Sequence, residues 1–468
     1  MMKIAYLHYH LKIGGVTTVL KQQINAVKND CSILVLSGAS PDPGFPADVS
    51  IIKGAGYHIK GIQQEKSGDA ADNIIRAIYS RWPDGCDILH VHNPILAKNS
   101  SFLTILKILQ EKGIRLFLQV HDFAEDGRPT SYFEESYPSD CHYGVINSRD
   151  YNILLNAGLN RKGLHKIFNM VNTLDFGEYQ DQREGYVLYP VRAIRRKNIG
   201  EAILVSLFFK NREKLVVTLP PNSRQDILSH EEWKQFVSEK RLDVELEASA
   251  RHDFADLVMN AKFILTTSIT EGFGFSFSEP WTAGKILWGR KIPDICADFE
   301  KNGIVFKDFY TKLNVPLEWV GRKAFLEKWK SCARKNLALF GVNQDSWNID
   351  RFYEKITENE LVDFGLLDEN FQKKIIMRII TDRHDVMELK RINPFLLDLD
   401  PKVPESIISN NRNVVLESYG NDIYRKALLK IYKEVTCNNV THKIDKKKLL
   451  FSFLNPQGFS LLKWEPYD

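Results

Sequence analysis

The feature of this sequence that most constrains its fold is a repeated alternation of short apolar runs with helical segments. Apolar runs of strand length begin at Ile4–Leu7 and return at intervals as far as Ala261–Thr267. Between them, apolar residues recur at helical spacing, as in the segment from Val16 to Val27. Strands that alternate with helices in this way predict parallel, doubly wound α/β sheets.

The alternation occurs twice, which predicts two α/β domains that face a cleft. A chain of 468 residues also exceeds what one hydrophobic core usually holds. We assign residues 1–175 to the first domain and residues 176–355 to the second. Residues 356–468 are charged and rich in helical patterns, and they are predicted to form a helical C-terminal extension.

The composition is that of a protein that folds in water, with 44% hydrophobic and 26% charged residues. A net charge of +4 is too weak to predict nucleic-acid binding, although it suits an anionic ligand and leaves weak association with a membrane surface open. The six cysteines form no C-x-x-C pair, and we see neither a signal-peptide pattern nor an apolar run of transmembrane length. We therefore expect a cytoplasmic protein; its oligomeric state stays open.

A glycine turn flanked by carboxylates follows the last strand of the second domain. It consists of Glu271, Gly272, Phe273 and Gly274, with Glu279 eight positions after the first glutamate. Ligands of open α/β sheets bind where this turn lies, at the carboxyl ends of the strands. The glycines let a ligand approach the backbone, and the carboxylates accept hydrogen bonds from hydroxyl groups. For Glu279, a helix capping box that begins at Ser276 is the structural alternative.

Two further turns have the chemistry of a phosphate site. The turn after the first strand of the second domain contains Arg192, Arg195, Arg196 and Lys197. Arginine contacts phosphate oxygens in a bidentate manner and lysine adds a point charge, so this turn suits a polyanion; a basic surface loop is the alternative. In the first domain, Gly14-Gly15 precedes a helix whose N-terminal N–H groups suit a phosphate.

Taken together, these motifs resemble the retaining nucleotide-sugar glycosyltransferases of family 4, which have the GT-B fold of two Rossmann-like domains. The resemblance covers roughly residues 3 to 355. It rests on the Glu271–Gly274 turn with Glu279, on Arg192 five positions before Lys197, and on Gly14-Gly15. It implies transfer of a hexose from a nucleotide-diphosphate sugar to a hydroxyl acceptor, without a metal or another cofactor.

The resemblance also implies a role for each matching residue of the second domain. Glu271 would lie at the donor sugar near the reacting carbon, and Glu279 would hold the ribose. The backbone N–H groups of Gly272, Phe273 and Gly274 would contact sugar hydroxyls. Arg192 and Lys197 would clamp the diphosphate.

In the first domain, the resemblance implies that Gly14 and Gly15 approach the same diphosphate. His121 follows a strand and matches a family histidine that lies at the sugar and phosphate. A structural histidine at the end of a strand is its alternative. His92 is a weaker candidate for the acceptor side.

The sequence departs from the family after the second glutamate, where the bulky Trp281 stands and the family's Gly-x-Pro is missing, so the resemblance does not imply the shape of the pocket. The Asp398-Leu399-Asp400 segment looks like a metal-binding motif but is expected to be a loop feature of the extension.

A disaccharide phosphorylase of the same fold and a non-catalytic scaffold that binds sugar nucleotides are the alternative functions. UDP, GDP and ADP donors all stay open, and a small soluble acceptor is favoured. The segment Val362–Glu369 has a short similarity to compatible-solute glycosyltransferases, too short to decide the substrate.

Overall fold

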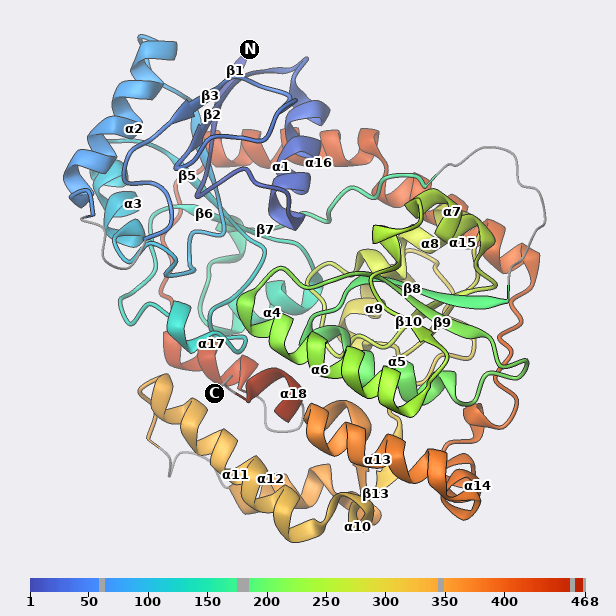
Figure 1. The fold of residues 1–468 in the computed structure, drawn as a ribbon. Helices are drawn as coiled ribbons and strands as arrows, with labels where there is room; N and C mark the ends of the chain where they lie inside the picture. Colours follow the sequence, from blue (N-terminus) through green and yellow to red (C-terminus); the bar gives the residue numbers. More distant parts are fainter. Residues whose placement is uncertain (59–63, 175–184, 344–348, 455–458, 466–468) are drawn as a thin grey trace. The chain divides into compact units, whose positions relative to one another are not determined.

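The computed structural model describes residues 1–58, 64–174, 185–343, 349–454 and 459–465 (Figure 1). Their contacts divide the chain into two compact units. Unit 1 comprises Met1–Met170 and Tyr419–Leu454, and unit 2 comprises Val171–Ser418 and Asn455–Asp468. The segment expected to form one C-terminal extension is thus divided between the two units. The expected domain boundary at residue 175 lies outside the described residues.

Unit 1 is built on a seven-stranded sheet in the order β3-β2-β1-β4-β5-β6-β7, with every neighbouring pair parallel. Its strands are β1 (Met2–His8), β2 (Cys31–Ser37), β3 (Val49–Ile51), β4 (Ile88–His92), β5 (Leu116–Val120), β6 (His142–Val145) and β7 (Leu164–Lys166). The strand order reverses between β1 and β4. The loops that follow these strands therefore diverge at the carboxyl edge of the sheet, where such folds bind ligands.

The helices of unit 1 come from both ends of the chain. They are α1 (Gly15–Val27), α2 (Ser67–Arg81), α3 (Phe102–Glu111), α4 (Ser148–Asn156), α16 (Asn421–Cys437) and α17 (Lys446–Phe453). Figure 1 shows α16 beside α1. Leu428, Ile431 and Val435 of α16 are buried in one core cluster with Ile4 of β1 and Leu20 of α1. The C-terminal segment is therefore part of the core of unit 1.

Unit 2 contains a second parallel sheet, of five strands, in the order β10-β9-β8-β11-β12. Its strands are β8 (Tyr186–Arg192), β9 (Lys214–Leu219), β10 (Val244–Glu245), β11 (Ile264–Thr266) and β12 (Leu287–Gly289). Here the order reverses between β8 and β11. The basic turn follows β8 and the glycine turn follows β11, so both expected ligand loops lie at this switch point.

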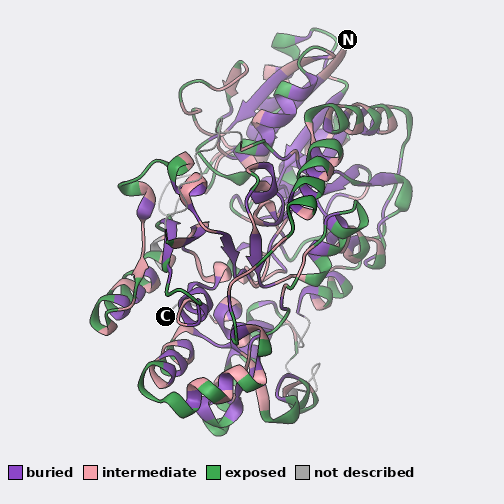
Figure 2. Cartoon of the chain, turned by 90° about the vertical axis from the view of Figure 1, so that its right-hand side faces the viewer, coloured by how far each residue is buried: buried purple, intermediate pink, exposed green. Residues whose placement is uncertain are grey.

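Unit 2 contains helices that lie between its strands in the sequence and further helices from the C-terminal part of the chain. They are α5 (Ile199–Ser206), α6 (Arg224–Lys240), α7 (Phe254–Asn260), α8 (Glu279–Thr282), α9 (Pro293–Lys301), α10 (Leu317–Val320), α11 (Arg322–Leu339), α12 (Ile349–Ile356), α13 (Glu369–Thr381), α14 (Arg383–Ile392), α15 (Glu405–Tyr419) and α18 (Leu461–Trp464). An antiparallel pair, β13 (Asn314–Pro316) and β14 (Leu361–Asp363), joins distant parts of the sequence. The strands are mostly buried, whereas many helices expose their outer faces (Figure 2).

The architecture confirms the expected fold class of two parallel-sheet, Rossmann-like domains with many helices. Within the described residues, no helix is both long enough and apolar enough to cross a membrane.

Candidate functional site

An ion cluster around the buried carboxylate of Glu271 lies at the switch point of unit 2, where the loops after β8 and β11 meet. Lys197 Nζ donates a hydrogen bond to Glu271 Oε1. Arg196 Nη1 lies 3.3 Å from the other carboxylate oxygen, Glu271 Oε2. Glu271 is only 7% exposed, so its charge depends on these two cations rather than on water.

The cluster alters the titration of its members. Burial acts to raise the pKa of Glu271, but attraction by Lys197 and Arg196 outweighs it and holds the pKa below its usual value. Burial is also the main cause that lowers the pKa of Lys197. Glu271 is therefore an ionised carboxylate at neutral pH.

Hydrogen bonds to the backbone fix the position of Lys197. Its carbonyl oxygen accepts from the Tyr189 hydroxyl at 2.7 Å and from Thr267 Oγ1 at 3.1 Å. The next residue, Asn198, has φ of 54°, in the left-handed region that asparagine tolerates better than most residues. Residues of β8 and of the loop after β11 thus hold the turn that presents Lys197.

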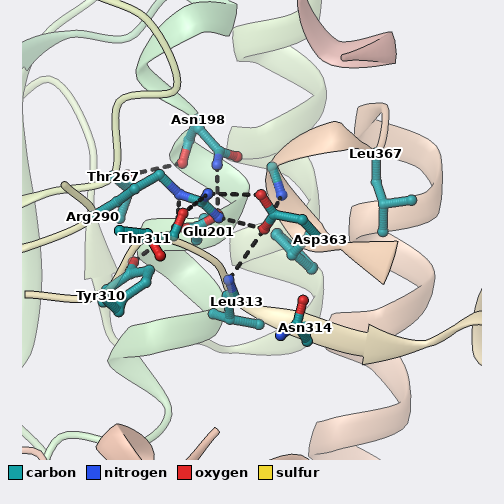
Figure 3. Close-up of polar contacts among 12 residues, drawn as sticks. Asn198, Glu201, Thr267, Arg290, Tyr310, Thr311, Leu313, Asn314, Asp363 and Leu367 are labelled. Atoms are coloured by element: carbon teal, nitrogen blue, oxygen red, sulfur yellow. Dashed lines mark hydrogen bonds and ion pairs between the residues drawn. The ribbon is translucent and has the colours of Figure 1, made fainter. Parts of the chain in front are cut away.

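A second network, of hydrogen bonds and ion pairs around Arg290, holds the same turn through Asn198 (Figure 3). Asn198 Nδ2 donates to Glu201 Oε2 at 2.8 Å. The guanidinium of Arg290 donates to both oxygens of Glu201, at 2.7 and 2.6 Å, and to both oxygens of Asp363, at 2.8 and 2.7 Å. Tyr310 donates to Glu201 Oε1 at 2.7 Å. The loop after β12 and strand β14 are thereby connected to the residue that follows Lys197.

Glu279 occupies a different environment from Glu271. No hydrogen-bond partner of its carboxylate lies among the described residues, and helix α8 has no side-chain cap. Ser278 Oγ donates instead to the carbonyl oxygen of Phe275 at 3.2 Å. The capping-box alternative for Glu279 is therefore not what the structure has. Burial raises the pKa of Glu279 to about 7, against the attraction of Lys197.

The other basic residues of the turn have separate contacts. Arg192 Nη1 donates to the carbonyl oxygen of Pro220 at 2.8 Å. Arg195 Nη1 donates to the carbonyl oxygen of Glu465 at 2.8 Å and its Nε lies 3.9 Å from Glu369. Arg196, to which the sequence assigned no individual role, is the arginine that meets Glu271. The diphosphate clamp of Arg192 and Lys197 stays a prediction.

The side chain of Trp281 lies in the core of unit 2 and is not exposed to a ligand in this structure. It is completely buried, and its Nε1 donates to the carbonyl oxygen of Phe277 at 3.0 Å. Phe273 is also buried and packs on the rings of Phe275 and Phe299, at centroid distances of 5.0 and 5.4 Å. The side chains of Phe273 and Trp281 form core beneath the turn, so a ligand would not contact them but could meet the backbone of the turn and its glutamates.

Gly274 is required by both conformation and space. Its φ is 91°, and a Cβ atom there would lie 2.9 Å from Ile295 Cγ2. We predict that Gly274→Ala destabilises unit 2 by more than the roughly 1–2 kcal/mol that the left-handed conformation alone costs an alanine. Gly284→Ala is the matched control, because Gly284 also has a positive φ, of 66°, but no atom within 4 Å of its Cβ position. Hydrogen exchange at β11 and β12 measures both effects, and equal losses would contradict the packing argument.

The predicted residues of unit 1 lie at the carboxyl edge of its sheet. Helix α1 begins at Gly15, and no acidic residue stands in its first turn. A Cβ atom at Gly15 would meet nothing within 4 Å, so packing does not require this glycine, and the backbone is open to an approaching ligand.

His121 directly follows β5, and His92 ends β4 beside it. His92 Nδ1 lies 2.9 Å from His121 Nε2. His121 is 7% exposed, whereas His92 is completely buried, so His92 contacts His121 rather than a ligand. Burial lowers the pKa of His121 to about 4, and the imidazole is therefore neutral at pH 7.

Acidic groups outside this site have structural partners. Asp398 and Asp400 pair with Lys210 and Lys262 at 2.9 and 2.7 Å. Both aspartates thus form ion pairs with lysines of unit 2, as expected of a loop feature. His384, Asp385 and Glu388 on α14 are the one grouping of potential metal ligands among the described residues, and Asp385 pairs there with Arg378 at 2.9 Å.

Known proteins are similar to this chain along almost its whole length. No profile of a known protein family matches. A mannosylglucosyl-3-phosphoglycerate synthase from Petrotoga mobilis is 24% identical in an alignment 481 residues long, gaps included, which covers 93% of this chain and 92% of that protein.

Two solved structures show the same arrangement of elements. HepE from Anabaena, in complex with UDP-glucose, has a TM-score of 0.53 and 13% identity, covering 92% of this chain and 99% of its own. A glycosyltransferase from Rickettsia africae has a TM-score of 0.54 and 11% identity, covering 93% of this chain and 99% of its own. The chain therefore has the GT-B fold of these glycosyltransferases.

Proposed function

We propose that this protein is a retaining, metal-independent glycosyltransferase that moves a hexose from a nucleotide-diphosphate sugar to a hydroxyl acceptor. The observation that carries the proposal is the cluster at the switch point of unit 2. It combines an ion pair, Lys197 with Glu271, and the carboxylate of Glu279, which has no hydrogen-bond partner in the part of the chain that the structure describes. Cations for phosphate and carboxylates for hydroxyls are the groups that a nucleotide sugar needs.

The charges of the cluster suit the chemistry of glycosyl transfer. The bond between the anomeric carbon and the diphosphate oxygen breaks, and its electron pair leaves with the nucleoside diphosphate. The acceptor oxygen forms the new bond, and its proton passes to a leaving phosphate oxygen. Lys197 and the N–H groups of the glycine turn would stabilise the departing negative charge, and Glu271 would lie beside the sugar as it becomes positive.

The acceptor we propose is a small, acidic sugar derivative. The name of the relative from Petrotoga mobilis describes a product that contains mannose, glucose and 3-phosphoglycerate, and that protein aligns with 93% of this chain. A phosphorylated or carboxylated acceptor also agrees with the net charge of +4. The sequence also favours a small soluble acceptor.

A donor panel tests the proposal. Calorimetry or thermal shift with UDP-, GDP- and ADP-sugars identifies the donor, and acceptors with and without an acidic group are then offered with it. Mass spectrometry detects the product, NMR of the new anomeric centre reports retention or inversion, and EDTA tests the need for a metal. Release of a sugar phosphate from a disaccharide with inorganic phosphate, without a nucleotide, would select the phosphorylase alternative instead.

The raised pKa of Glu279 predicts how donor binding depends on pH. If Glu279 accepts hydrogen bonds from ribose hydroxyls, it binds them as a carboxylate, and its pKa of about 7 means that protons compete with the donor. We expect donor affinity to rise between pH 6 and pH 8 and to level off above the pKa of Glu279. Below that pKa, a single competing proton changes the affinity by at most about tenfold per pH unit. Calorimetry at several pH values measures this. Glu279→Gln should bind more weakly and lose the pH dependence; an unchanged dependence in that variant would assign it to another group.

A further inference from the structure

Unit 1 contains two pairs of histidines with the same geometry. In the first pair, His92 Nδ1 lies 2.9 Å from His121 Nε2, with ring centroids 5.2 Å apart and ring planes 12° apart. In the second, His142 Nδ1 lies 2.8 Å from His165 Nε2, with values of 5.1 Å and 14°. Nearly parallel rings at these separations place one N–H on the lone pair of the other ring. Each pair therefore shares one proton between the two facing nitrogens.

His92 and His142 each have a second ring nitrogen, Nε2, that faces away from the partner histidine. The surroundings of this Nε2 differ between the two pairs and set the direction of the shared hydrogen bond. His142 Nε2 lies 2.9 Å from the carbonyl oxygen of Asn438, which only accepts. His142 must hold its proton there, so its Nδ1 accepts from His165. His92 Nε2, by contrast, is buried and has no partner in the described part of the chain.

A proton on His92 Nε2 would be a buried N–H group without an acceptor, which is rarer in proteins than a bare acceptor. The proton of a neutral His92 therefore belongs on Nδ1, from which it is donated to His121 Nε2. Burial lowers the pKa of His92 well below its usual value and that of His121 to about 4, so both rings are neutral at pH 7. With Nε2 accepting, a neutral His121 holds its own proton on Nδ1.

We infer that His92 is a positioning residue that fixes His121 as the Nδ1–H tautomer, so that His121 offers a hydrogen-bond donor at the carboxyl edge of unit 1. No partner of His121 Nδ1 lies among the described residues, and His121 keeps part of its surface exposed. This donor suits an oxygen of a phosphate or a sugar hydroxyl, and it cannot act as a general base. The functional part of the inference rests on the proposed glycosyl transfer, whereas the tautomer does not.

Neighbouring side chains hold His92 in place for this task. The ring of His90 stacks on His92 with centroids 4.5 Å apart and planes 22° apart. His90 Nε2 lies 2.9 Å from Gln119 Oε1, and its Nδ1 lies 2.9 Å from the hydroxyl of Tyr432 on α16. His8 Nδ1 lies 3.2 Å from the carbonyl oxygen of His92.

Nuclear magnetic resonance of the full chain tests the tautomers directly, because protonated and bare ring nitrogens have distinct ¹⁵N shifts. The spectrum is recorded on ¹⁵N-histidine-labelled protein without substrate at pH 7.5, and signals are assigned by their loss in His121→Gln and His92→Phe. We expect His92 and His121 to carry hydrogen on Nδ1, and His142 to carry it on Nε2 as the internal control. Hydrogen on His121 Nε2 in the wild type would overturn the inference, whether or not the protein transfers sugar.

Kinetics tests what the tautomer does. His92→Phe keeps an aromatic ring and removes the hydrogen bond, and we expect kcat to fall roughly 10- to 100-fold, the loss typical of residues that orient a metal-ligating histidine. Donor affinity by calorimetry should change less than threefold. His92→Asn, whose amide can still donate from near the Nδ1 position, should restore most of kcat. Wild-type kcat in folded His92→Phe would overturn the positioning role and leave the proposed transferase function intact.

Discussion

Lys197→Ala and Glu271→Ala are expected to abolish sugar transfer while both proteins stay folded. Lys197 is the half-buried cation that we expect to bind the diphosphate, and it pairs with Glu271, the buried carboxylate of the cluster. Removing one preorganised group that stabilises developing charge typically lowers kcat by about 10²- to 10³-fold. Steady-state kinetics with the donor from the nucleotide-sugar panel measures this, and circular dichroism reports the fold.

The control for these two variants is Lys210→Ala. Lys210 is an exposed lysine of the same unit and pairs with Asp398 at 2.9 Å, so its loss should leave kcat within about twofold, because exposed ion pairs contribute little. Lys197→Ala leaves Glu271 with Arg196, which is why unit 2 should tolerate the change. Transfer at the wild-type rate in either Lys197→Ala or Glu271→Ala would exclude the proposed role of the cluster.

Arg290→Met is expected to destabilise unit 2 by about 3–5 kcal/mol, the usual effect of removing one partner from a buried ion network. Arg290 is 4% exposed and Glu201 is 0% exposed, so without the guanidinium the buried carboxylate of Glu201 and the half-buried carboxylate of Asp363 would lose their cation (Figure 3). Hydrogen exchange at the amides of β8 and β12 measures the free energy of opening of this unit alone. Because the network also holds Asn198, donor affinity should decrease at the same time.

Arg251→Met separates the effect of burial from that of a lost ion pair. Arg251 pairs with Glu245 at 3.0 Å in the same unit, but its side chain is 65% exposed. We expect a change below about 1 kcal/mol. A loss of similar size in the two variants would show that burial of the Arg290 network adds nothing to stability.

The two sheets could be predicted from sequence because long apolar strands and helices of regular period leave a local signal. The first apolar run of the sequence, Ile4–Leu7, lies inside strand β1, Met2–His8. Strands β3 and β7 have three residues each and, unlike the equally short β11, do not lie within a longer apolar run, so they leave little signal in the sequence. The pairing of β13 with β14 joins residues 314 and 363 and leaves no local pattern at all. Helix α2 was also not predicted, although Ala70, Ile74 and Ile78 recur at helical spacing.

The candidate site was predictable as a set of loops but not as a set of contacts. Motif spacing indicated Glu271 and Lys197, which the structure brings together. Four cations lie within six residues, and their directions depend on a short 3₁₀ turn, Arg195–Lys197, in which each residue rotates the side chain by about a third of a turn. Sequence alone therefore could not tell that Arg196 reaches Glu271 while Arg195 contacts the end of the chain. The burial of Trp281 could not be predicted either, because a bulky residue beside a motif has the same local sequence whether it faces a ligand or the core.

The contribution of α16 to unit 1 has a consequence for the order in which the protein is made. The ribosome completes residues 1–170 early, but the face of the sheet that receives Leu428, Tyr432 and Val435 stays without its cover until residue 437 has emerged. The contiguous segment 171–418 of unit 2 is synthesised in between. The first part of the chain to be translated is thus not the first to be finished, and during this interval its uncovered apolar face is the surface that a chaperone would recognise.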